Sequence, residues 1–234
     1  MALCVVGGFR CAPQRMACEL FNREIRMKSR RPSSRRWLAE HEQDAFVHRA
    51  RAEGWRSRAV FKLIEIQKRE RILRPGMTCI DLGASPGGWS QYAAGIVGTR
   101  GRVVALDRLP MEPVTGVEFI HGDFHEPEVL ETLKRVLGES RADLVMADMA
   151  PNLTGMGAID QPRAMALAEL ARDLACEVLV PGGNLLVKTF QGEGFQDLVN
   201  DLKTRFQVVK TRKPAASRAR SNEVYLVARN YRMV

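Results

Sequence analysis

The segment Asp81-Leu-Gly-Ala-Ser-Pro-Gly-Gly-Trp89 joins the end of an apolar strand to a glycine-rich turn and the start of a helix. Glycine adopts positive φ angles at little cost and has no Cβ, so such a turn lets the backbone approach a nucleotide-like ligand closely. The spacing differs from the G-x-G-x-x-G pattern of dinucleotide-binding proteins, which disfavours a nicotinamide cofactor. We therefore expect this segment to begin an α/β domain with a site for a nucleotide-like ligand.

Outward from this turn, apolar strand patterns alternate with helical patterns along the chain. The patterns predict strands at residues 77–82, 102–106, 117–120, 143–147, 184–189, 207–210 and 224–228. They predict helices at residues 35–53, 57–73, 88–97, 127–137, 162–179 and 195–206. Alternation of this kind favours a mostly parallel, seven-stranded sheet with helices on both faces, which is an α/β fold.

Composition narrows the class of protein. The chain has 234 residues, 45% of them hydrophobic, which is enough to bury a full core. Its apolar runs fall short of the roughly 20 residues that a membrane-spanning helix needs. The five cysteines form no C-x2-C pattern, and neither they nor the four histidines have metal-ligand spacing. We therefore expect a cytoplasmic protein with no membrane span and no metal site.

Positive charge is concentrated in a few segments. Residues 1–36 contain nine Arg or Lys and two Glu, out of a net charge of +9 for the whole chain. Residues 49–74 contain nine basic and three acidic side chains, and residues 203–220 contain seven basic and none acidic. Such segments beside a near-neutral body favour a polyanionic partner, most often a nucleic acid, although each one alone is also compatible with a solvated surface.

The first residues differ from the rest of the chain. Residues 1–26 lack the alternating pattern, and Met27 precedes the basic run Lys28-Ser-Arg-Arg-Pro-Ser-Ser-Arg-Arg36. We interpret residues 1–33 as a basic, disordered extension, within which residues 1–26 are an over-long gene prediction, and residues 34–234 as one domain.

Candidate ligand-binding residues follow several of the predicted strands. Gly83, Gly87 and Gly88 follow the first strand, where the ligands of open α/β sheets bind. Asp107 ends the second strand, where a carboxylate can accept hydrogen bonds from two ribose hydroxyls, and Asp123 follows the third, where it could accept from an adenine amino group. The plainer alternative is that both aspartates only form turns.

Four residues that are far apart in the sequence are candidates for catalysis: Lys62, Asp148, Lys188 and Glu223. Lys188 lies in an apolar strand, where a lysine is costly unless it is paired or serves a site. Taken alone, Lys62 is equally compatible with a surface lysine, and Glu223 with a solvated strand start. Spacing does not show whether the four side chains converge.

Several motifs resemble those of the FtsJ-type (RrmJ/RlmE) large-subunit ribosomal RNA 2′-O-methyltransferases. The resemblance extends from about residue 34 to about residue 228. It rests on residues 57–62, 81–91, 122–124, 149–152, 162–165, 187–195, 212–214, 217–221 and 223–225. Small departures are Ser85, Arg108 and Ala147, none of which removes a charge from the candidate set.

This resemblance implies a Rossmann-like methyltransferase domain that binds S-adenosylmethionine. It implies a catalytic Lys–Asp–Lys–Glu set at the four candidates above, and cofactor contacts at Gly87, Trp89, Asp107, Asp123 and Asp148. The expected reaction is methylation of a uridine 2′-hydroxyl in the A loop of 23S ribosomal RNA, on the assembled large subunit, by a monomeric enzyme. Lys188 would either accept the hydroxyl proton as a neutral amine or stabilise negative charge on the oxygen as an ammonium.

Two other functions remain compatible with the motifs. One is a 2′-O-methyltransferase of the same fold that acts on transfer RNA or on the messenger RNA cap. A cap enzyme should have an aromatic cap-stacking site, and with three Trp and three Tyr none is visible. The other is a ribosome-assembly factor that binds RNA without chemistry, which should have lost a residue of the catalytic set.

Overall fold

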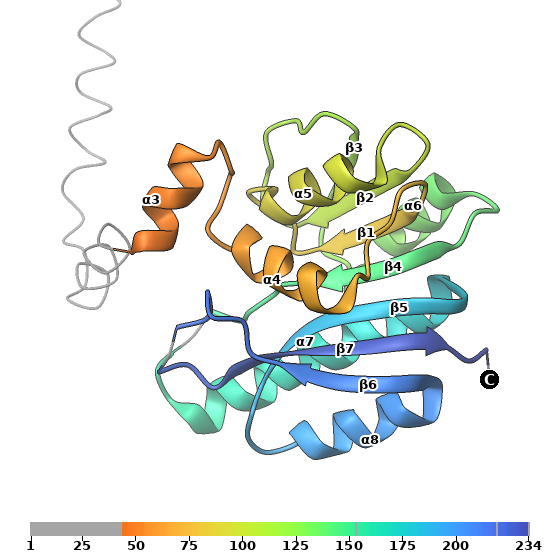
Figure 1. Cartoon of the computed structure of the whole chain (residues 1–234). Coiled ribbons are helices and arrows are strands. Elements are labelled where there is room, and N and C mark those ends of the chain that lie inside the picture. The colour runs from red at the N-terminus through yellow and green to blue at the C-terminus, as the bar shows by residue number, and fades with distance from the viewer. Residues whose placement is uncertain (1–43, 153, 219, 234) are drawn as a thin grey trace, which may run out of the picture. The chain divides into compact units, whose positions relative to one another are not determined.

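A seven-stranded sheet forms the centre of the protein, with the strand order β3-β2-β1-β4-β5-β7-β6 (Figure 1). The neighbours among β1 to β5 run parallel, and β7 is antiparallel to both β5 and β6. The strands are β1 (Thr78–Leu82), β2 (Arg102–Asp107), β3 (Val117–His121), β4 (Ala142–Ala147), β5 (Leu179–Phe190), β6 (Phe206–Arg212) and β7 (Glu223–Tyr231). The predicted seven-stranded, mostly parallel sheet of a Rossmann-like methyltransferase fold is therefore confirmed.

The structure is a computed structural model, and it describes residues 44–233 except 153 and 219. Residues Ala45–Val234 form one compact unit. The predicted basic extension 1–33, Met27 and the first part of the predicted helix 35–53 lie outside the described residues. Within them, no helix is both long enough and apolar enough to cross a lipid bilayer.

Helices cover both faces of the sheet. They are α3 (Ala45–Ala52), α4 (Val60–Glu70), α5 (Gly88–Val97), α6 (Pro127–Leu137), α7 (Gly157–Val178) and α8 (Phe195–Arg205). One hydrophobic cluster packs α4 and α5 against inward residues such as Leu144 and Met146, and the other packs α6, α7 and α8 against the alternate residues such as Val145 and Ala147. Successive side chains of a strand point to opposite faces, so both faces of β4 are buried.

Among the elements predicted wholly within the described residues, the largest differences from the predicted bounds are at the starts of α7 and β5. Helix α7 begins at Gly157, five residues before Pro162, which was expected to start it. Asp160 accepts hydrogen bonds from the main-chain N–H groups of Thr154 and Gly155, so the first turn is held by the loop before it. Strand β5 begins at Leu179, five residues before its predicted start. Residues 181–183, which were expected to separate a helix from the strand, lie within β5. Leu179 pairs with Ala142 of β4, and the register between the two strands shifts after this pair.

Candidate active site

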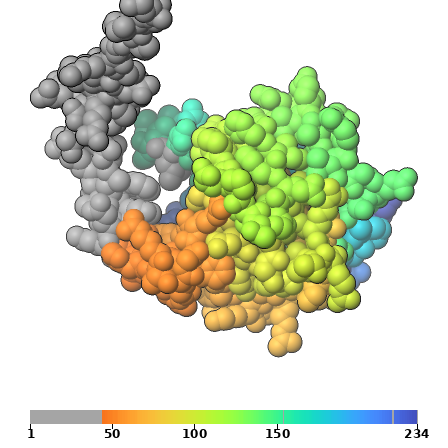
Figure 2. Space-filling view, turned by 90° about the horizontal axis from the view of Figure 1, so that it is seen from above, coloured from red at the N-terminus to blue at the C-terminus, as the bar shows by residue number. Residues whose placement is uncertain are grey.

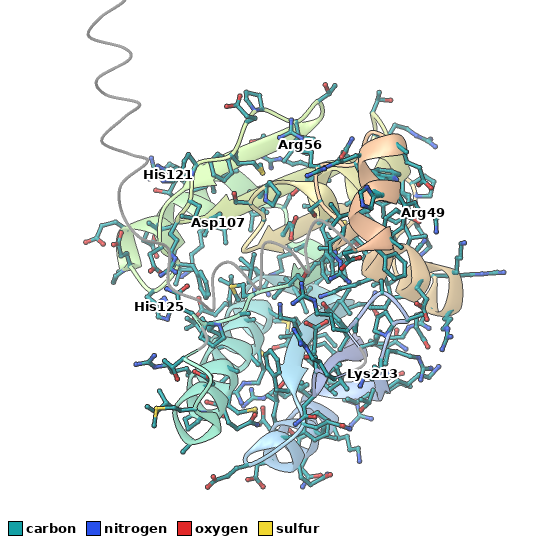
Figure 3. The ribbon with its side chains drawn as sticks, turned by 90° about the vertical axis from the view of Figure 1, so that its left-hand side faces the viewer. Arg49, Arg56, Asp107, His121, His125 and Lys213 are labelled. Atoms are coloured by element: carbon teal, nitrogen blue, oxygen red, sulfur yellow. The ribbon has the colours of Figure 1, made fainter. Side chains whose placement is uncertain are left out.

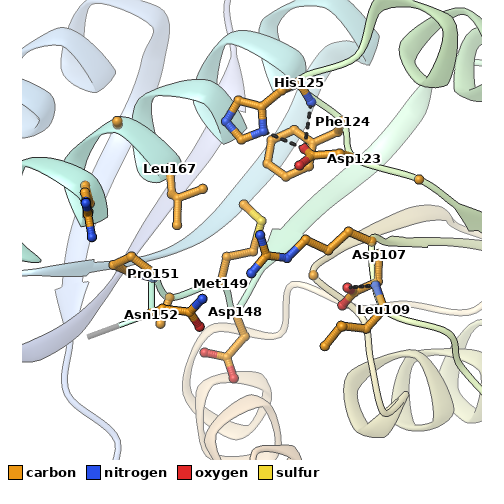
Figure 4. Close-up of a pocket in the computed structure, with 16 residues that line it drawn as sticks. Asp107, Leu109, Asp123, Phe124, His125, Asp148, Met149, Pro151, Asn152 and Leu167 are labelled. Carbon is orange, nitrogen blue, oxygen red and sulfur yellow. Dashed lines mark hydrogen bonds and ion pairs between the residues drawn. The ribbon is translucent and has the colours of Figure 1, made fainter. Parts of the chain in front are cut away.

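A pocket of about 560 Å³ lies at the carboxyl ends of the strands (Figure 4). Gly83 after β1, Asp107 at the end of β2, Asp123 after β3 and Asp148 after β4 line it, together with apolar side chains that include Leu109, Phe124, Met149 and Leu167. Ligands of open α/β sheets bind at this position, and the volume suits a nucleotide-sized molecule. Gly87, Gly88 and Trp89 are not among the described residues that line the pocket.

Asp107 ties together two segments that border the pocket. Its Oδ2 accepts a hydrogen bond from the main-chain N–H of Ser85 in the glycine-rich turn, at 2.8 Å. Its Oδ1 accepts one from the N–H of Leu109 in the loop after β2, also at 2.8 Å. A carboxylate offers about four lone-pair sites, so each oxygen can accept a further hydrogen bond from a ligand hydroxyl.

Asp123 is held by the residue two positions later. His125 contacts Asp123 Oδ1 through its ring Nδ1 at 2.5 Å and donates its main-chain N–H to the same oxygen at 3.1 Å (Figure 4). These hydrogen bonds hold the pKa of Asp123 below its usual value. The rings of Phe124 and His125 stack with their centroids 5.1 Å apart. Asp123 is therefore an oriented anion at one side of the pocket, suited to accept a hydrogen bond from an amino group.

The glycine-rich turn needs its glycines for close packing. Gly83 and Gly87 have φ angles of 71° and 101°, which glycine adopts without strain. A Cβ at Gly83 would collide with the side chain of Met149. A Cβ at Gly87 would meet Met111, Val114 and Arg56, and one at Gly88 would meet Ser57. The loop after β2 and the segment before α4 therefore both pack closely against the turn.

Trp89 also faces this supporting segment. Its indole N–H donates to the main-chain oxygen of Ala59 at 2.8 Å, and its ring lies 5.8 Å from that of Tyr225. Trp89 is buried, so its contacts support the turn from within the protein core.

The four catalytic candidates converge beside the pocket. Lys188 Nζ lies 3.0 Å from Asp148 Oδ1 and donates to the main-chain oxygen of Asp148 at 3.2 Å. Lys62 Nζ lies 2.7 Å from Glu223 Oε1 and 3.8 Å from Asp148 Oδ1. Helix α4, the end of β4, the end of β5 and the start of β7 supply one residue each. Because β7 is antiparallel to β5 and pairs Glu223 with Phe190, its first residue lies at the edge where the parallel strands end.

Asp148 is the residue shared by the pocket and the lysine cluster. Burial alone would raise the pKa of Asp148, but the ammonium groups of Lys188 and Lys62 and the Tyr225 hydroxyl outweigh it and lower the pKa. Asp148 is therefore ionised at neutral pH. An ionised carboxylate between two ammonium groups can fix the position of both and can align Lys188 toward a group bound in the pocket.

Tyr225 and Ser217 join this network, and neither was among the residues predicted from the sequence. The Tyr225 hydroxyl donates to Asp148 Oδ1 at 2.6 Å and lies 3.3 Å from Glu223 Oε1, while Ser217 Oγ donates to Glu223 Oε1 at 2.8 Å. The Lys62 ammonium lies 5.5 Å from the centre of the Tyr225 ring, within cation–π range. The i, i+2 spacing of Glu223 and Tyr225 could have identified Tyr225, because such residues share one face of a strand.

Asp81 is a buried acid behind the site. Its Oδ2 accepts a hydrogen bond from Ser90 Oγ at 2.6 Å. Burial raises the pKa of Asp81 to about 7; the Ser90 hydrogen bond opposes this, and the charges of Asp148 and Asp107 add to it. The first acid of the glycine-rich motif is therefore partly protonated at neutral pH.

The basic segments do not all present their charges to solvent. Arg49 is exposed and pairs with Glu53, whereas Arg56 and Arg58 donate to main-chain carbonyl groups elsewhere in the protein. Lys210 and Arg212 contact the buried Glu70. Among the described residues, no cluster of three or more His, Cys, Asp or Glu side chains has an arrangement able to hold a metal ion.

Comparison with known proteins identifies the family of this chain. A family model described as FtsJ-like methyltransferase matches residues 55–231. A crystal structure of a proposed ribosomal RNA methyltransferase from Plasmodium falciparum has a TM-score of 0.68 and 27% sequence identity, over 76% of this chain and 98% of that one. A proposed rRNA methylase from Clostridium thermocellum has a TM-score of 0.48 and 17% identity, over 72% and 96% of the two chains. Since the family model spans most of the sequence, the chain belongs to the FtsJ-like methyltransferase family.

Proposed function

We propose that this protein uses S-adenosylmethionine to methylate the ribose 2′-hydroxyl of a uridine in the A loop of 23S ribosomal RNA, on the assembled large subunit. The observation that carries the proposal is the position of Asp148, which lines the pocket and also contacts Lys188 and Lys62. A nucleotide-sized pocket and a buried lysine–carboxylate network therefore meet at one side chain. A methyl donor and an unreactive hydroxyl need this kind of shared site.

The residues that line the pocket fit S-adenosylmethionine. Asp107 would accept hydrogen bonds from the ribose hydroxyls, and Asp123 would accept one from the adenine amino group. Leu109, Phe124, Met149 and Leu167 offer apolar surface for the adenine ring. Bound S-adenosylmethionine supplies a methyl group whose bond to sulfur breaks as the new bond to the 2′-oxygen forms.

The lysines act on the hydroxyl side of the reaction. The Lys188 ammonium forms an ion pair with an ionised Asp148, so we assign Lys188 the role of a fixed cation. In this role Lys188 orients the 2′-hydroxyl and stabilises the negative charge that develops on its oxygen, and the hydroxyl proton leaves to solvent late in the methyl transfer. Glu223 holds Lys62, and Tyr225 holds the shared carboxylate, so the network is oriented before the substrate arrives. A neutral Lys188 that accepts the hydroxyl proton is the alternative.

An RNA substrate is supported by charge and by the comparisons. The described part of the chain carries exposed arginines on α3, such as Arg49 and Arg51, and the basic loop after β6. The similar Plasmodium falciparum protein is described as a proposed ribosomal RNA methyltransferase. We propose that the protein acts as a monomer in the cytoplasm, and that residues 1–26 are dispensable for methylation.

The decisive experiment is incubation with tritiated S-adenosylmethionine and separate RNA pools. The pools are assembled large subunits, protein-free 23S RNA, transfer RNA and capped messenger RNA, and the labelled nucleotide is mapped after nuclease digestion. We expect label on one uridine 2′-oxygen in assembled subunits, from the full chain and from a chain that begins at Met27. Lys188→Ala serves as the inactive control.

Each alternative has its own outcome. Label confined to transfer RNA or to the cap would assign a different substrate to the same site. Cofactor binding without label in any pool, together with tight binding to large subunits, would support a non-catalytic assembly factor. Label on a base instead of a ribose would contradict the proposed reaction.

A further inference from the structure

We propose that Arg56 is a positioning residue of the cofactor site and not an RNA contact; this inference rests on the proposed function. Arg56 belongs to the basic segment 49–74, whose charge favours a polyanionic partner such as a nucleic acid. Its side chain instead connects the glycine-rich turn to the loop after β2, the two segments that border the pocket. In Figure 3, Arg56 and Asp107 lie in the upper part of the molecule, well apart from Lys213.

The guanidinium group of Arg56 is occupied by three main-chain carbonyl groups. Nη1 donates to the oxygen of Glu112 at 2.6 Å and to that of Pro86 at 3.4 Å, and Nη2 donates to the oxygen of Pro113 at 2.5 Å. Pro86 belongs to the glycine-rich turn, whereas Glu112 and Pro113 belong to the loop after β2. One side chain therefore bridges two segments that are more than twenty residues apart in the sequence.

The main chain around Arg56 is anchored to α5. The N–H of Arg56 donates to the side-chain oxygen of Gln91 at 3.2 Å, and the Gln91 amide donates to the oxygen of Gly54 at 3.0 Å. The Trp55 ring packs on Tyr92, with centroids 5.9 Å apart. In the space-filling view this orange segment lies directly against the yellow surface of α5 (Figure 2).

The bridged loop carries part of the pocket wall. Asp107, Arg108 and Leu109 line the pocket at the start of the loop, and Arg56 holds Glu112 and Pro113 near its end. Between these points Ser85 Oγ donates to the oxygen of Pro110 at 3.2 Å. The loop is thus fixed to the turn at both ends, which keeps Asp107 and Leu109 in place for a ligand.

The shape of the arginine side chain, and not its charge, explains this arrangement. The acceptors are neutral carbonyl groups, so no carboxylate requires a cation here. A planar guanidinium offers five N–H donors in a fixed fork, whereas a lysine offers three donors at one point. Lysine at position 56 would keep the charge but would not bridge carbonyl groups on two segments. A phosphate contact, in contrast, is largely retained when lysine replaces arginine.

Arg56→Lys in the full chain therefore separates the two roles. We expect the dissociation constant and the KM for S-adenosylmethionine to rise by about fivefold or more, with kcat at saturating cofactor within about twofold of wild type. The slope of log RNA affinity against log salt should stay unchanged. Arg51→Lys and Arg51→Ala, at an exposed position of the same segment, are the matched controls and should leave cofactor affinity unchanged.

A second measurement does not require the cofactor. Hydrogen exchange of the five main-chain amides between residues 108 and 114, which exclude Pro110 and Pro113 and include the Leu109 N–H bonded to Asp107, should be faster in Arg56→Lys than in wild type at equal thermal stability. Cofactor affinity within twofold of wild type, or unchanged exchange in this loop, would overturn the assignment. If wild type itself fails to bind S-adenosylmethionine, or binds it without methylating RNA, the proposed function fails instead.

Discussion

Two clusters of oppositely charged side chains in this protein contain similar residues but differ in how deeply their lysines and arginines are buried. In one, Glu70 at the end of α4 contacts Lys210, Arg212 and Arg229. In the other, Asp148 and Glu223 contact Lys62 and Lys188. The Glu70 side chain is 2% exposed while its basic partners are 30–42% exposed, whereas all four side chains of the second group are 8–13% exposed.

The comparison teaches which features of an ionic cluster indicate catalysis. The half-exposed cations around Glu70 reach water, and Arg212 grips the carboxylate with two nitrogens, which suits a fixed structural contact. The second group buries lysines, whose ammonium is a single point charge that can turn toward a substrate. The second group also borders the pocket, because Asp148 is one of the residues that line it. Substitutions in the two groups should therefore affect different properties.

The largest expected effect is on the reaction. Lys188→Ala should lower kcat by about 10²–10³-fold or more, because it removes a preorganised charge from the reacting oxygen. Cofactor affinity should stay within a few fold, because Lys188 is not among the residues that line the pocket. Single-turnover kinetics and calorimetry measure the two effects. Lys188→Arg keeps the charge but cannot accept a proton, so activity above that of the alanine variant supports the fixed-cation role. Wild-type turnover in Lys188→Ala would remove this residue from the mechanism.

Substitution of Glu70 should affect stability instead. Burial alone would raise the pKa of Glu70, but the hydrogen bonds from Arg212 and Lys210 outweigh it, so the folded protein holds an ionised carboxylate there. Glu70→Gln should lower the free energy of unfolding by about 1–3 kcal/mol and leave kcat within about threefold. Denaturant titration is the measurement. Glu118→Gln, which breaks the more exposed pair with Arg102, is the control and should cost about 0.5 kcal/mol or less. Equal losses in both variants would contradict the distinction.

Asp107→Ala should act on the pocket without touching either cluster. Loss of charge-assisted hydrogen bonds to the ribose should weaken S-adenosylmethionine binding by about 10-fold or more. Excess cofactor should partly restore methylation, since the lysine network is intact. Calorimetry with the cofactor tests this, and Asp107→Asn, which keeps the shape, should lose less. Unchanged affinity in the alanine variant would place the ribose elsewhere.

A further expected effect concerns pH and the buried Asp81. Its pKa is about 7 in the folded protein and 3.8 in the reference state, so between these pH values the folded protein holds a proton that the unfolded chain has released. The contribution of Asp81 to the free energy of unfolding therefore falls as the pH rises through this range, by up to about 1.4 kcal/mol per pH unit. Asp81→Asn should remove this slope and gain stability relative to wild type from pH 5 to pH 8. Parallel stability curves for the two proteins would contradict the shifted pKa.

The sequence predicts most of the fold because the informative patterns are local. Helices α5 and α6 have the predicted bounds, since each lies between clear strand and glycine signals. The two largest boundary errors are at residues where local rules conflict. Pro162 is favoured in the first turn of a helix, yet α7 begins before it. There Asp160 accepts a hydrogen bond from the main-chain N–H of Thr154, which fixes the first turn to the preceding loop. Pro181-Gly182-Gly183 reads as a break, yet pairing of Leu179 with Ala142 keeps it within β5.

The site is less accessible to sequence reasoning because its contacts are long-range. The residues Gly83, Asp107, Asp123 and Asp148 could be grouped from strand ends alone, because parallel strands end at one edge. Lys62 and Glu223 required a resemblance to known proteins, since nothing local indicates that α4 and β7 meet there. Ser217 lies in a segment that contributes to the resemblance, but nothing local indicates that its hydroxyl reaches Glu223. The contacts of Arg56 could not be predicted, because charge patterns do not distinguish a phosphate contact from a bridge between carbonyl groups.

The position of β7 has a consequence for the order in which the protein is made. β7 follows β5 and β6 in the sequence but lies between them in the sheet. Before it emerges during synthesis, β5 has an open edge and Lys62 lacks Glu223. Insertion of β7 between β5 and β6 completes the seven-stranded sheet and places Glu223 and Tyr225 in the site at the same time. A nascent chain can therefore assemble the pocket residues of β1–β4 early, but it acquires the complete lysine–carboxylate network only when its sheet is finished.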